Sequence, residues 1–217
     1  VAGDVHLEDF AYAPFHTPYP GMVRKAAALA YRHVTRDTAV EDELAESIGR
    51  QPRRESFDED GEYEEAVREY MDALKETEQY QDWYGAVVDP TLTISRDVGN
   101  WYTGSVHLAR VSALKTALEA DRDVTGESML VASYGSGAQA EIHGEVVQDG
   151  WADEIAALDV DEQIAERYDL SWPEYEQVHD RHNHETDSEL EEFTTPEAEF
   201  VFDGWGRMGE RKYTYVE

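Results

Sequence analysis

The apolar residues in the middle of this chain change their spacing, and the change predicts one helix followed by two strands. Over residues 106–120 they recur every three or four positions, which places them on one face of a helix. Residues 128–133 form a continuous apolar run of the kind found in buried strands, and residues 138–147 predict a second strand. This order of elements, with few hairpin signals, favours an α/β architecture built from layers of helices and sheet.

Four segments nearer the N-terminus also show regular patterns. Residues 9–15 place bulky aromatic side chains among small ones and predict a short buried strand. An alanine-rich stretch over residues 21–35 predicts a helix, and residues 41–48 predict a second, short helix. Residues 62–83 predict one long acidic helix with solvated charge on its outer face.

The C-terminal third begins with a strong helix-start signal. Ser171 is a suitable cap, Pro173 suits the first turn, and Glu174 follows the serine by three residues. Further on, residues 193–217 carry aromatic side chains between glycines and predict a covering pair of strands.

The charge balance is extreme for a chain of this size. The 217 residues hold 18 lysines and arginines against 49 aspartates and glutamates, a formal net charge of −31. Aromatic residues are frequent and the acidic ones are spread along the length, so we expect a folded chain whose surface is adapted to high salt. No basic stripe is present to meet nucleic acid phosphates, and no apolar run is long enough to span a membrane.

The absence of cysteine narrows the chemistry further. With no cysteine in the sequence, disulfides, zinc–thiolate sites and a cysteine nucleophile are excluded within this chain. The sequence shows neither an initiator methionine nor a signal-peptide pattern, so we expect it to begin within a longer protein.

The most unusual local pattern lies in residues 15–25. His16 follows the first predicted strand, and the helix that comes next opens with Arg24 and Lys25 in an otherwise acidic chain. Basic residues in a first helical turn oppose the helix dipole, and together with free backbone N–H groups they favour a bound anion such as a phosphate. His16 is accordingly a candidate general acid or base, with a structural role as the alternative.

Two further segments are candidates for substrate contact. The loop Ser133-Tyr134-Gly135-Ser136-Gly137 follows a buried strand, and its glycines allow backbone N–H groups to approach a ligand, although an ordinary tight turn fits equally well. It is not a serine-hydrolase elbow, because Tyr134 stands where that motif needs glycine. Asn100, in Gly99-Asn100-Trp101-Tyr102, is suited to bonding a ligand carbonyl or to capping the following helix.

Histidines elsewhere carry weaker signals. His179, His182 and His184, with Asp180 and Glu185, resemble a metal cluster, but His184 does not share the helix face of the other two, and a hydrated polar helix end fits better. His107 and His143 belong to no motif, and we interpret them as incidental.

The three segments around His16, Asn100 and Ser136 occur in an order that resembles the C-terminal half of the hydroxymethylglutaryl-CoA synthase family. The resemblance covers most of residues 9–144 and is less distinctive through 200–205. It implies an α/β fold, the C-terminal half of a thiolase-like fold, with a mixed sheet covered by helices. We expect residues 1–217 to form this half-domain and residues 39–95 to be an acidic helical insertion within it.

The resemblance also implies an activity, the condensation of acetyl-CoA with acetoacetyl-CoA in the mevalonate route. In the family an acetylated cysteine and a glutamate act together with a histidine that polarises the acetoacetyl thioester. By position His16 resembles that histidine, Asn100 an active-site asparagine, Ser136 a serine whose N–H helps form the oxyanion hole, and Lys25 a contact to coenzyme A. Gly21 departs from the pattern, because relatives often carry a second lysine there that contacts coenzyme A; we expect Arg24 to substitute in part.

A chain without cysteine cannot perform the covalent step of that reaction. We therefore expect this chain to be inactive alone and to need an N-terminal half that carries the cysteine and glutamate, in a cytoplasmic homodimer with no cofactor beyond its CoA substrates and no nucleic acid or membrane partner. Two alternatives stay open: another thiolase-like condensing enzyme, or a non-catalytic acyl-CoA-binding or scaffold module in which His16 is structural.

Overall fold

A computed structural model of the chain describes residues 9–135, 139–176, 200–205 and 211–215, with side-chain surroundings given for residues up to 176. The chain divides into two compact units, Val1–Glu166 and Arg167–Glu217, each described here by itself. Within the described residues, no helix is both long and apolar enough to cross a membrane.

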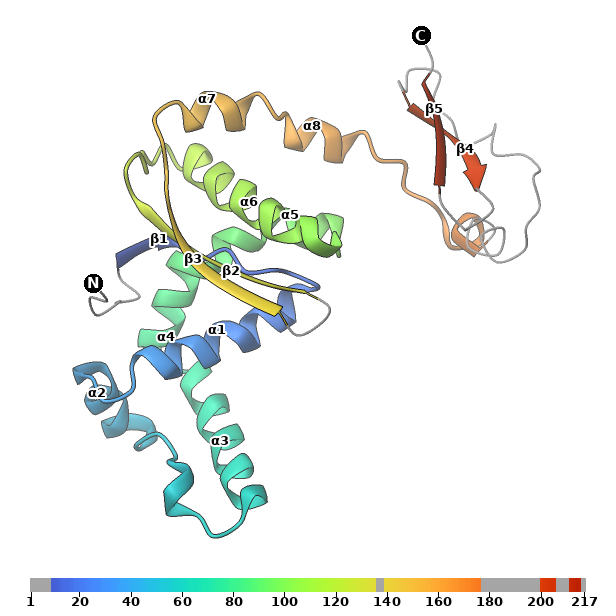
Figure 1. Ribbon diagram of the computed structural model, residues 1–217. Helices are drawn as coiled ribbons and strands as arrows, with labels where there is room; N and C mark the ends of the chain where they lie inside the picture. The colour runs from blue at the N-terminus through green and yellow to red at the C-terminus, as the bar shows by residue number, and fades with distance from the viewer. Residues whose placement is uncertain (1–8, 136–138, 177–199, 206–210, 216–217) are drawn as a thin grey trace. The chain divides into compact units, whose positions relative to one another are not determined.

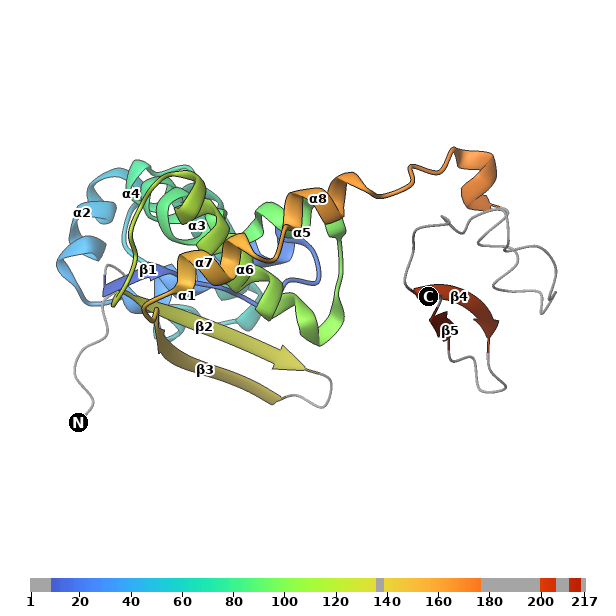
Figure 2. The ribbon, with the colours of Figure 1, turned by 90° about the horizontal axis from the view of Figure 1, so that it is seen from above.

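A three-stranded mixed sheet forms the centre of the first unit (Figures 1 and 2). Strand β1 (Phe10–Tyr12) pairs in parallel with β2 (Ser128–Gly135), which pairs antiparallel with β3 (Gln139–Val146). An isolated parallel bridge between Phe15 and Ala132 continues the first pairing beyond β1. The predicted strands are confirmed, and the sequence over 9–15 is split between a short strand and this bridge.

Helices α1 (Pro20–Val34) and α6 (Ser105–Glu119) pack against the sheet through separate clusters of apolar residues. One cluster joins the sheet to α6 through Tyr12, Ala113, Ala117, Val124 and Met129. A second joins the sheet to α1 and the 84–92 segment through Ala13, Val23, Ala27, Val88 and Leu92. Both helices match their predicted ranges to within one residue, and the small alanines on their buried faces allow close packing.

Several helical segments connect α1 to α6. They are α2 (Ala39–Ile48), η2 (Arg54–Ser56), α3 (Asp60–Lys75), α4 (Glu78–Trp83), the π-helical turn η3 (Tyr84–Val88), η4 (Asp89–Leu92), α5 (Thr93–Val98) and η5 (Tyr102–Gly104).

The prediction of a single long helix over residues 62–83 is wrong. The chain breaks between α3 and α4 at Thr77, whose backbone is extended (φ −73°, ψ 144°) and whose hydroxyl accepts a hydrogen bond from the Tyr80 N–H. A threonine at the N-cap satisfies an N–H of the next helix that would otherwise lack a partner. The break lets Tyr80 pack beside Tyr31 in the core between α1 and α3.

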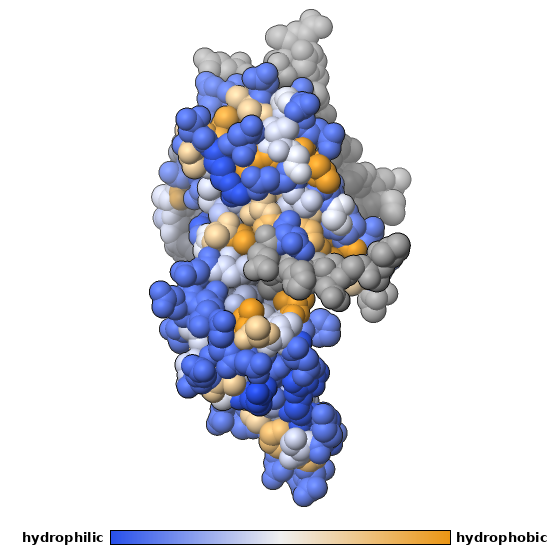
Figure 3. Space-filling view, turned by 90° about the vertical axis from the view of Figure 1, so that its left-hand side faces the viewer, coloured by the Kyte–Doolittle hydropathy of each residue, from blue (hydrophilic) through white to orange (hydrophobic). Residues whose placement is uncertain are grey.

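After the sheet, α7 (Trp151–Ala156) and α8 (Val160–Ala165) complete the first unit. The second unit begins with the predicted helix start, in which the Ser171 N–H donates to the Glu174 carboxylate over 2.7 Å. It ends with β4 (Phe200–Trp205) and β5 (Arg211–Tyr215), an antiparallel pair, so the strand pair predicted there is present. Figure 3 shows a face covered mostly by hydrophilic residues, as the excess of acidic side chains leads one to expect.

Candidate active site around His16

The backbone of His16 is attached to the edge of strand β2. The His16 N–H donates to the carbonyl oxygen of Ala132 over 2.8 Å, and the Ala132 N–H donates to the carbonyl oxygen of Pro14 over 2.9 Å. These two bonds continue the parallel pairing of β1 with β2 past the end of β1. They fix the position of the His16 Cα relative to the sheet before α1 begins four residues later.

The side chain of His16 contacts two segments that are distant in sequence. Its Nδ1 lies 2.8 Å from the hydroxyl of Ser105, the first residue of α6. Its ring meets the ring of Tyr134 on β2 edge to face, with centroids 4.6 Å apart and planes at 82°. His16 is half-buried, and this burial lowers its pKa below the ordinary 6.5, so the imidazole is neutral at neutral pH.

Tyr134 connects the histidine to α1. Its hydroxyl lies 2.9 Å from the sulfur of Met22, while its ring stays against His16. Residues 15–25, the turn before α6, and the end of β2 therefore meet around one imidazole. The sequence motifs containing His16 and Tyr134 are in direct contact, and the motif that begins at Gly99 reaches them through Ser105.

Asn100 lies five residues before Ser105 in the turn that leads into α6. Its Oδ1 accepts a hydrogen bond from the Tyr102 N–H over 2.8 Å, a local turn in which Tyr102 takes a positive φ of 48°. Positive φ in a bulky residue is strained, and such strain is found more often at functional sites than elsewhere. Asn100 is exposed, and its side chain stabilises this turn; it does not cap α6, whose N-cap is Gly104.

Two groups of predicted site residues fall outside the described part of the chain. Ser136 belongs to the connection between Gly135 and Gln139, the last paired positions of β2 and β3. His179, His182 and His184 lie in the range 177–199, which is also outside it. Within the described residues, no group of three or more metal-ligating side chains comes together.

Arg24 and Lys25 are exposed in the second turn of α1 and not in its first turn as predicted, because the helix begins at Pro20; the first turn holds no acidic residue. Arg24 and Gly21 line a cavity of about 330 Å³ that also receives Arg96, Lys75 and Asp89. Arg96 pairs with Asp89 over 2.5 Å and Lys75 with Asp72 over 2.7 Å, whereas Arg24 has no ion-pair partner among the described residues. In a chain with a net charge of −31, Arg24 is thus an uncompensated positive charge lining this cavity.

The histidines interpreted as incidental, His107 and His143, belong to a polar cluster that ties α6 to β3. Arg110 of α6 forms a bidentate ion pair with Glu145 and also contacts His107 Nδ1 over 2.7 Å. His143 Nε2 lies 2.9 Å from the same Glu145 carboxylate. Burial acts to raise the pKa of Glu145, but the hydrogen bonds from Arg110 and His143 outweigh it and hold that pKa below its ordinary value.

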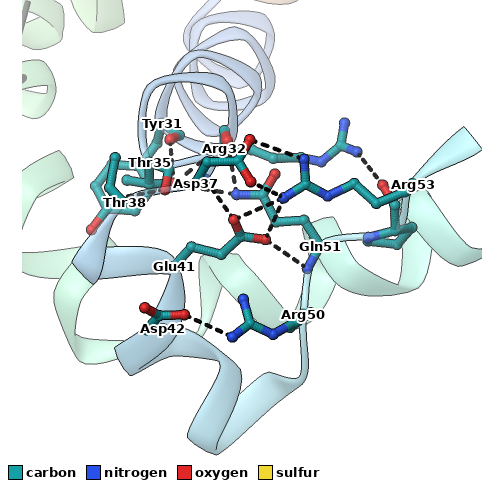
Figure 4. A network of polar contacts seen from close by, with 11 residues as sticks. Tyr31, Arg32, Thr35, Asp37, Thr38, Glu41, Asp42, Arg50, Gln51 and Arg53 are labelled. Atoms are coloured by element: carbon teal, nitrogen blue, oxygen red, sulfur yellow. Dashed lines mark hydrogen bonds and ion pairs between the residues drawn. The ribbon is translucent and has the colours of Figure 1, made fainter. Parts of the chain in front are cut away.

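A second polar network lies in the helical region between α1 and α3 (Figure 4). Glu41 of α2 is 1% exposed, and its carboxylate accepts hydrogen bonds from the backbone N–H groups of Asp37 and Gln51. Arg53 donates to both Glu41 and Asp37. A buried carboxylate with a cation and two N–H donors is fully compensated, so this network stabilises the connection between α1 and α2.

Ser105 is the site residue that the sequence did not reveal. A serine at the start of a helix is commonly a cap. Nothing in the residue spacing distinguishes such a cap from a serine whose hydroxyl forms a hydrogen bond with a distant histidine. Only the packing of α6 beside the end of β1 brings it there.

Comparison with known proteins shows the family and the fold to which this chain is similar. Residues 2–204 match the family model described as hydroxymethylglutaryl-coenzyme A synthase C terminal. A hydroxymethylglutaryl-CoA synthase of Haloferax volcanii is 64% identical over 217 residues, which are all of this chain and 49% of that protein. The chain thus spans about half the length of this relative.

Two solved structures show the same fold. MvaS in complex with 3-hydroxy-3-methylglutaryl coenzyme A aligns with a TM-score of 0.68 at 24% identity, covering 100% of this chain and 44% of that one. PksG, an HMG-CoA synthase from Bacillus subtilis, aligns with a TM-score of 0.67 at 19% identity, covering 99% of this chain and 46% of that one. The expected thiolase-like α/β architecture is confirmed.

Proposed function

The chain belongs to the hydroxymethylglutaryl-CoA synthase family, as its C-terminal half, and from this premise we propose that it serves the condensation of acetyl-CoA with acetoacetyl-CoA to hydroxymethylglutaryl-CoA. The observation that carries the proposal is the environment of His16. Strand β2 holds its backbone through Ala132, and the other two family motifs supply its Nδ1 partner, Ser105, and its ring contact, Tyr134. A non-catalytic scaffold module does not need an imidazole whose backbone, Nδ1 and ring are each fixed by a separate contact.

His16 is suited to polarising a thioester carbonyl. Burial keeps the imidazole neutral, and a neutral imidazole has one N–H to donate. Nδ1 is engaged with Ser105, and Nε2 has no hydrogen-bond partner among the residues that the structure describes. A donor fixed in place before substrate arrives stabilises charge that develops on a carbonyl oxygen. We assign this role to His16, with Asn100 and the backbone N–H of Ser136 as further substrate contacts.

The covalent step belongs to residues outside this chain. The sequence has no cysteine, so the acetyl group must be carried by a cysteine of an N-terminal half, with a glutamate there as acid and base. The partner of this chain is accordingly that half, and the complete enzyme is a homodimer. Neither a metal nor a further cofactor is required, because the acyl groups arrive as CoA thioesters.

Coenzyme A is proposed to approach the start of α1. Lys25 is exposed in the second turn of that helix, and its sequence neighbour Arg24 lines a cavity together with Arg96. Phosphate groups are bound by cations at helix N-termini, where free N–H groups also point outward. Arg24 takes over part of the role of the lysine that relatives carry at the position of Gly21.

The net charge of the chain indicates the salt concentration in which the enzyme works. A net charge of −31 is compatible with a folded chain when salt screens like charges over a few ångströms, so we propose a cytoplasm rich in salt. There the enzyme would supply the mevalonate route to isoprenoids.

Release of free coenzyme A tests the proposal. The 217-residue chain is assayed with both acyl-CoA substrates alone, and again when joined to its N-terminal half. We expect no turnover by the chain alone and sustained turnover by the joined protein, with hydroxymethylglutaryl-CoA as product. Turnover by the chain alone, or a joined protein that binds acyl-CoA without condensing it, would refute the proposal and favour one of the two alternatives.

A further inference from the structure

Ser105 has an unusual set of hydrogen bonds. Its side chain is fully buried, at 0% exposure, and among the described residues its hydroxyl has two partners. The Thr17 backbone N–H donates to Ser105 Oγ over 2.9 Å, and Oγ lies 2.8 Å from His16 Nδ1. Thr17 is itself fully buried, so water does not compete for its N–H.

The positions of the protons follow from counting donors and acceptors. A serine hydroxyl has one proton to give and two lone pairs. One lone pair is occupied by the Thr17 N–H. If His16 carried its proton on Nδ1, that N–H would take the second lone pair, and the serine proton would be left buried without an acceptor among the described residues. An unsatisfied buried donor costs about 1–3 kcal/mol.

The other tautomer satisfies every group. When Nδ1 is unprotonated, it accepts the serine proton, and Oγ still accepts from Thr17. His16 then carries its own proton on Nε2, the ring nitrogen that has no partner in the described part of the chain. The choice between the tautomers is therefore made by Ser105 and not by the substrate.

We propose that Ser105 is a positioning residue that holds His16 in the Nε2–H tautomer, so that the imidazole acts as a hydrogen-bond donor to the acyl-CoA carbonyl. This inference rests on the proposed function and adds to it the proton state of the histidine and the residue that sets it. A partner that fixes the tautomer of a functional imidazole is needed for activity even though it never touches the substrate.

Helix α6 offers a matched control. Ser112 lies on the same helix, is also fully buried, and also accepts a backbone N–H from a distant segment, that of Ile94 over 3.3 Å. Its own hydroxyl donates to the Leu108 carbonyl over 2.9 Å and does not contact a histidine. Replacing Ser112 with alanine therefore removes a comparable buried hydroxyl without affecting the His16 tautomer.

The test compares Ser105→Ala and Ser112→Ala in the complete enzyme. Two steps are followed: acetyl transfer from labelled acetyl-CoA to the enzyme, and condensation with acetoacetyl-CoA. We expect Ser105→Ala to lower kcat for condensation by about 10- to 100-fold while acetyl transfer stays unchanged. Ser112→Ala should leave both rates near those of the parent enzyme. Equal losses in the two variants, or a Ser105→Ala loss shared by both steps, would show a merely structural role and overturn the inference.

A second measurement needs no Ser105 variant. The ¹⁵N spectrum of histidine-labelled complete enzyme is recorded above pH 6.5, and the His16 signals are assigned by their loss in the His16→Gln variant. We expect a protonated Nε2 and an unprotonated Nδ1. The reverse pattern overturns the inference even if Ser105→Ala fails to fold. An enzyme that shows the expected pattern but forms no hydroxymethylglutaryl-CoA would instead refute the proposed function and leave the tautomer assignment standing.

Discussion

The rings of His16 and Tyr134 meet edge to face, with their centroids 4.6 Å apart, although the two residues are 118 positions apart in the sequence. Such a contact orients both rings and contributes about 0.5–1.5 kcal/mol beyond the area that it buries. We therefore predict that Tyr134→Leu lowers kcat/KM for acetoacetyl-CoA in the complete enzyme by about 3- to 10-fold. Tyr134→Phe keeps the ring and should retain most of the activity. Equal losses in both variants would show that the hydroxyl near Met22, and not the ring contact, is what matters.

The cations at the start of α1 should act on coenzyme A binding. We predict that Arg24→Ala and Lys25→Ala each raise KM for the acyl-CoA substrates about 3- to 5-fold, the effect of losing one exposed charge contact. Arg36→Ala, which removes an exposed arginine beyond the other end of α1, is the control and should leave KM unchanged. Because salt screens exposed charges, the differences should shrink as KCl is raised. A rise in KM that is independent of salt would contradict the electrostatic explanation.

The carboxylate of Glu41 should stabilise the folded chain. Removing one partner of a buried ion pair leaves the other charge and the N–H donors uncompensated, so Glu41→Ala is expected to lower the free energy of unfolding by about 3 kcal/mol. Asp42→Ala serves as the control, because that neighbouring carboxylate is exposed and, among the described residues, forms an ion pair with Arg50 alone; its loss should cost less than about 1 kcal/mol. Urea denaturation measures both, and similar losses would mean that the network is not stabilising.

The acid stability of the chain should depend on Glu145. Its pKa is lower in the folded chain than its ordinary value of 4.5, so the folded state binds a proton less readily than the unfolded state. The stabilisation that the ionised Glu145 carboxylate provides is fully present above pH 4.5 and is lost as the pH falls through the pKa of Glu145 in the folded chain. Glu145→Gln should flatten the dependence of unfolding free energy on pH below 4.5, as measured by denaturation at several pH values. An unchanged slope would show that other carboxylates cause the loss.

Sequence periodicity predicted the elements that pack on the sheet. Helix α6 and strand β2 were recognisable because their apolar spacing reports directly on burial. The prediction failed at Thr77, where one threonine ends a helix pattern that otherwise continues through Trp83. The segments from Tyr84 to Leu92 gave no periodic signal, since π-helical and 3₁₀ turns do not place side chains at the α-helical repeat.

The candidate site was predicted less completely. The local pattern of residues 15–25 marked His16 and Lys25 as candidates, but only the family resemblance gave them specific roles. The partners of His16 could not be found in this way: Ser105 is 89 positions away, and only the tertiary packing brings its hydroxyl to Nδ1. The cluster of Arg110 with Glu145 was missed for the same reason, because its members lie on a helix and a strand that meet only in the folded chain.

The central claim is that His16 serves condensation from a half of the enzyme that holds no nucleophile. The most direct test is to follow acetyl-enzyme formation and hydroxymethylglutaryl-CoA formation separately in the complete enzyme, with and without His16→Ala, near neutral pH. Acetyl transfer should proceed at the parent rate, while condensation falls by about 100-fold or more, the loss typical of a donor that stabilises developing charge. Condensation at the parent rate in a folded His16→Ala enzyme would contradict the account.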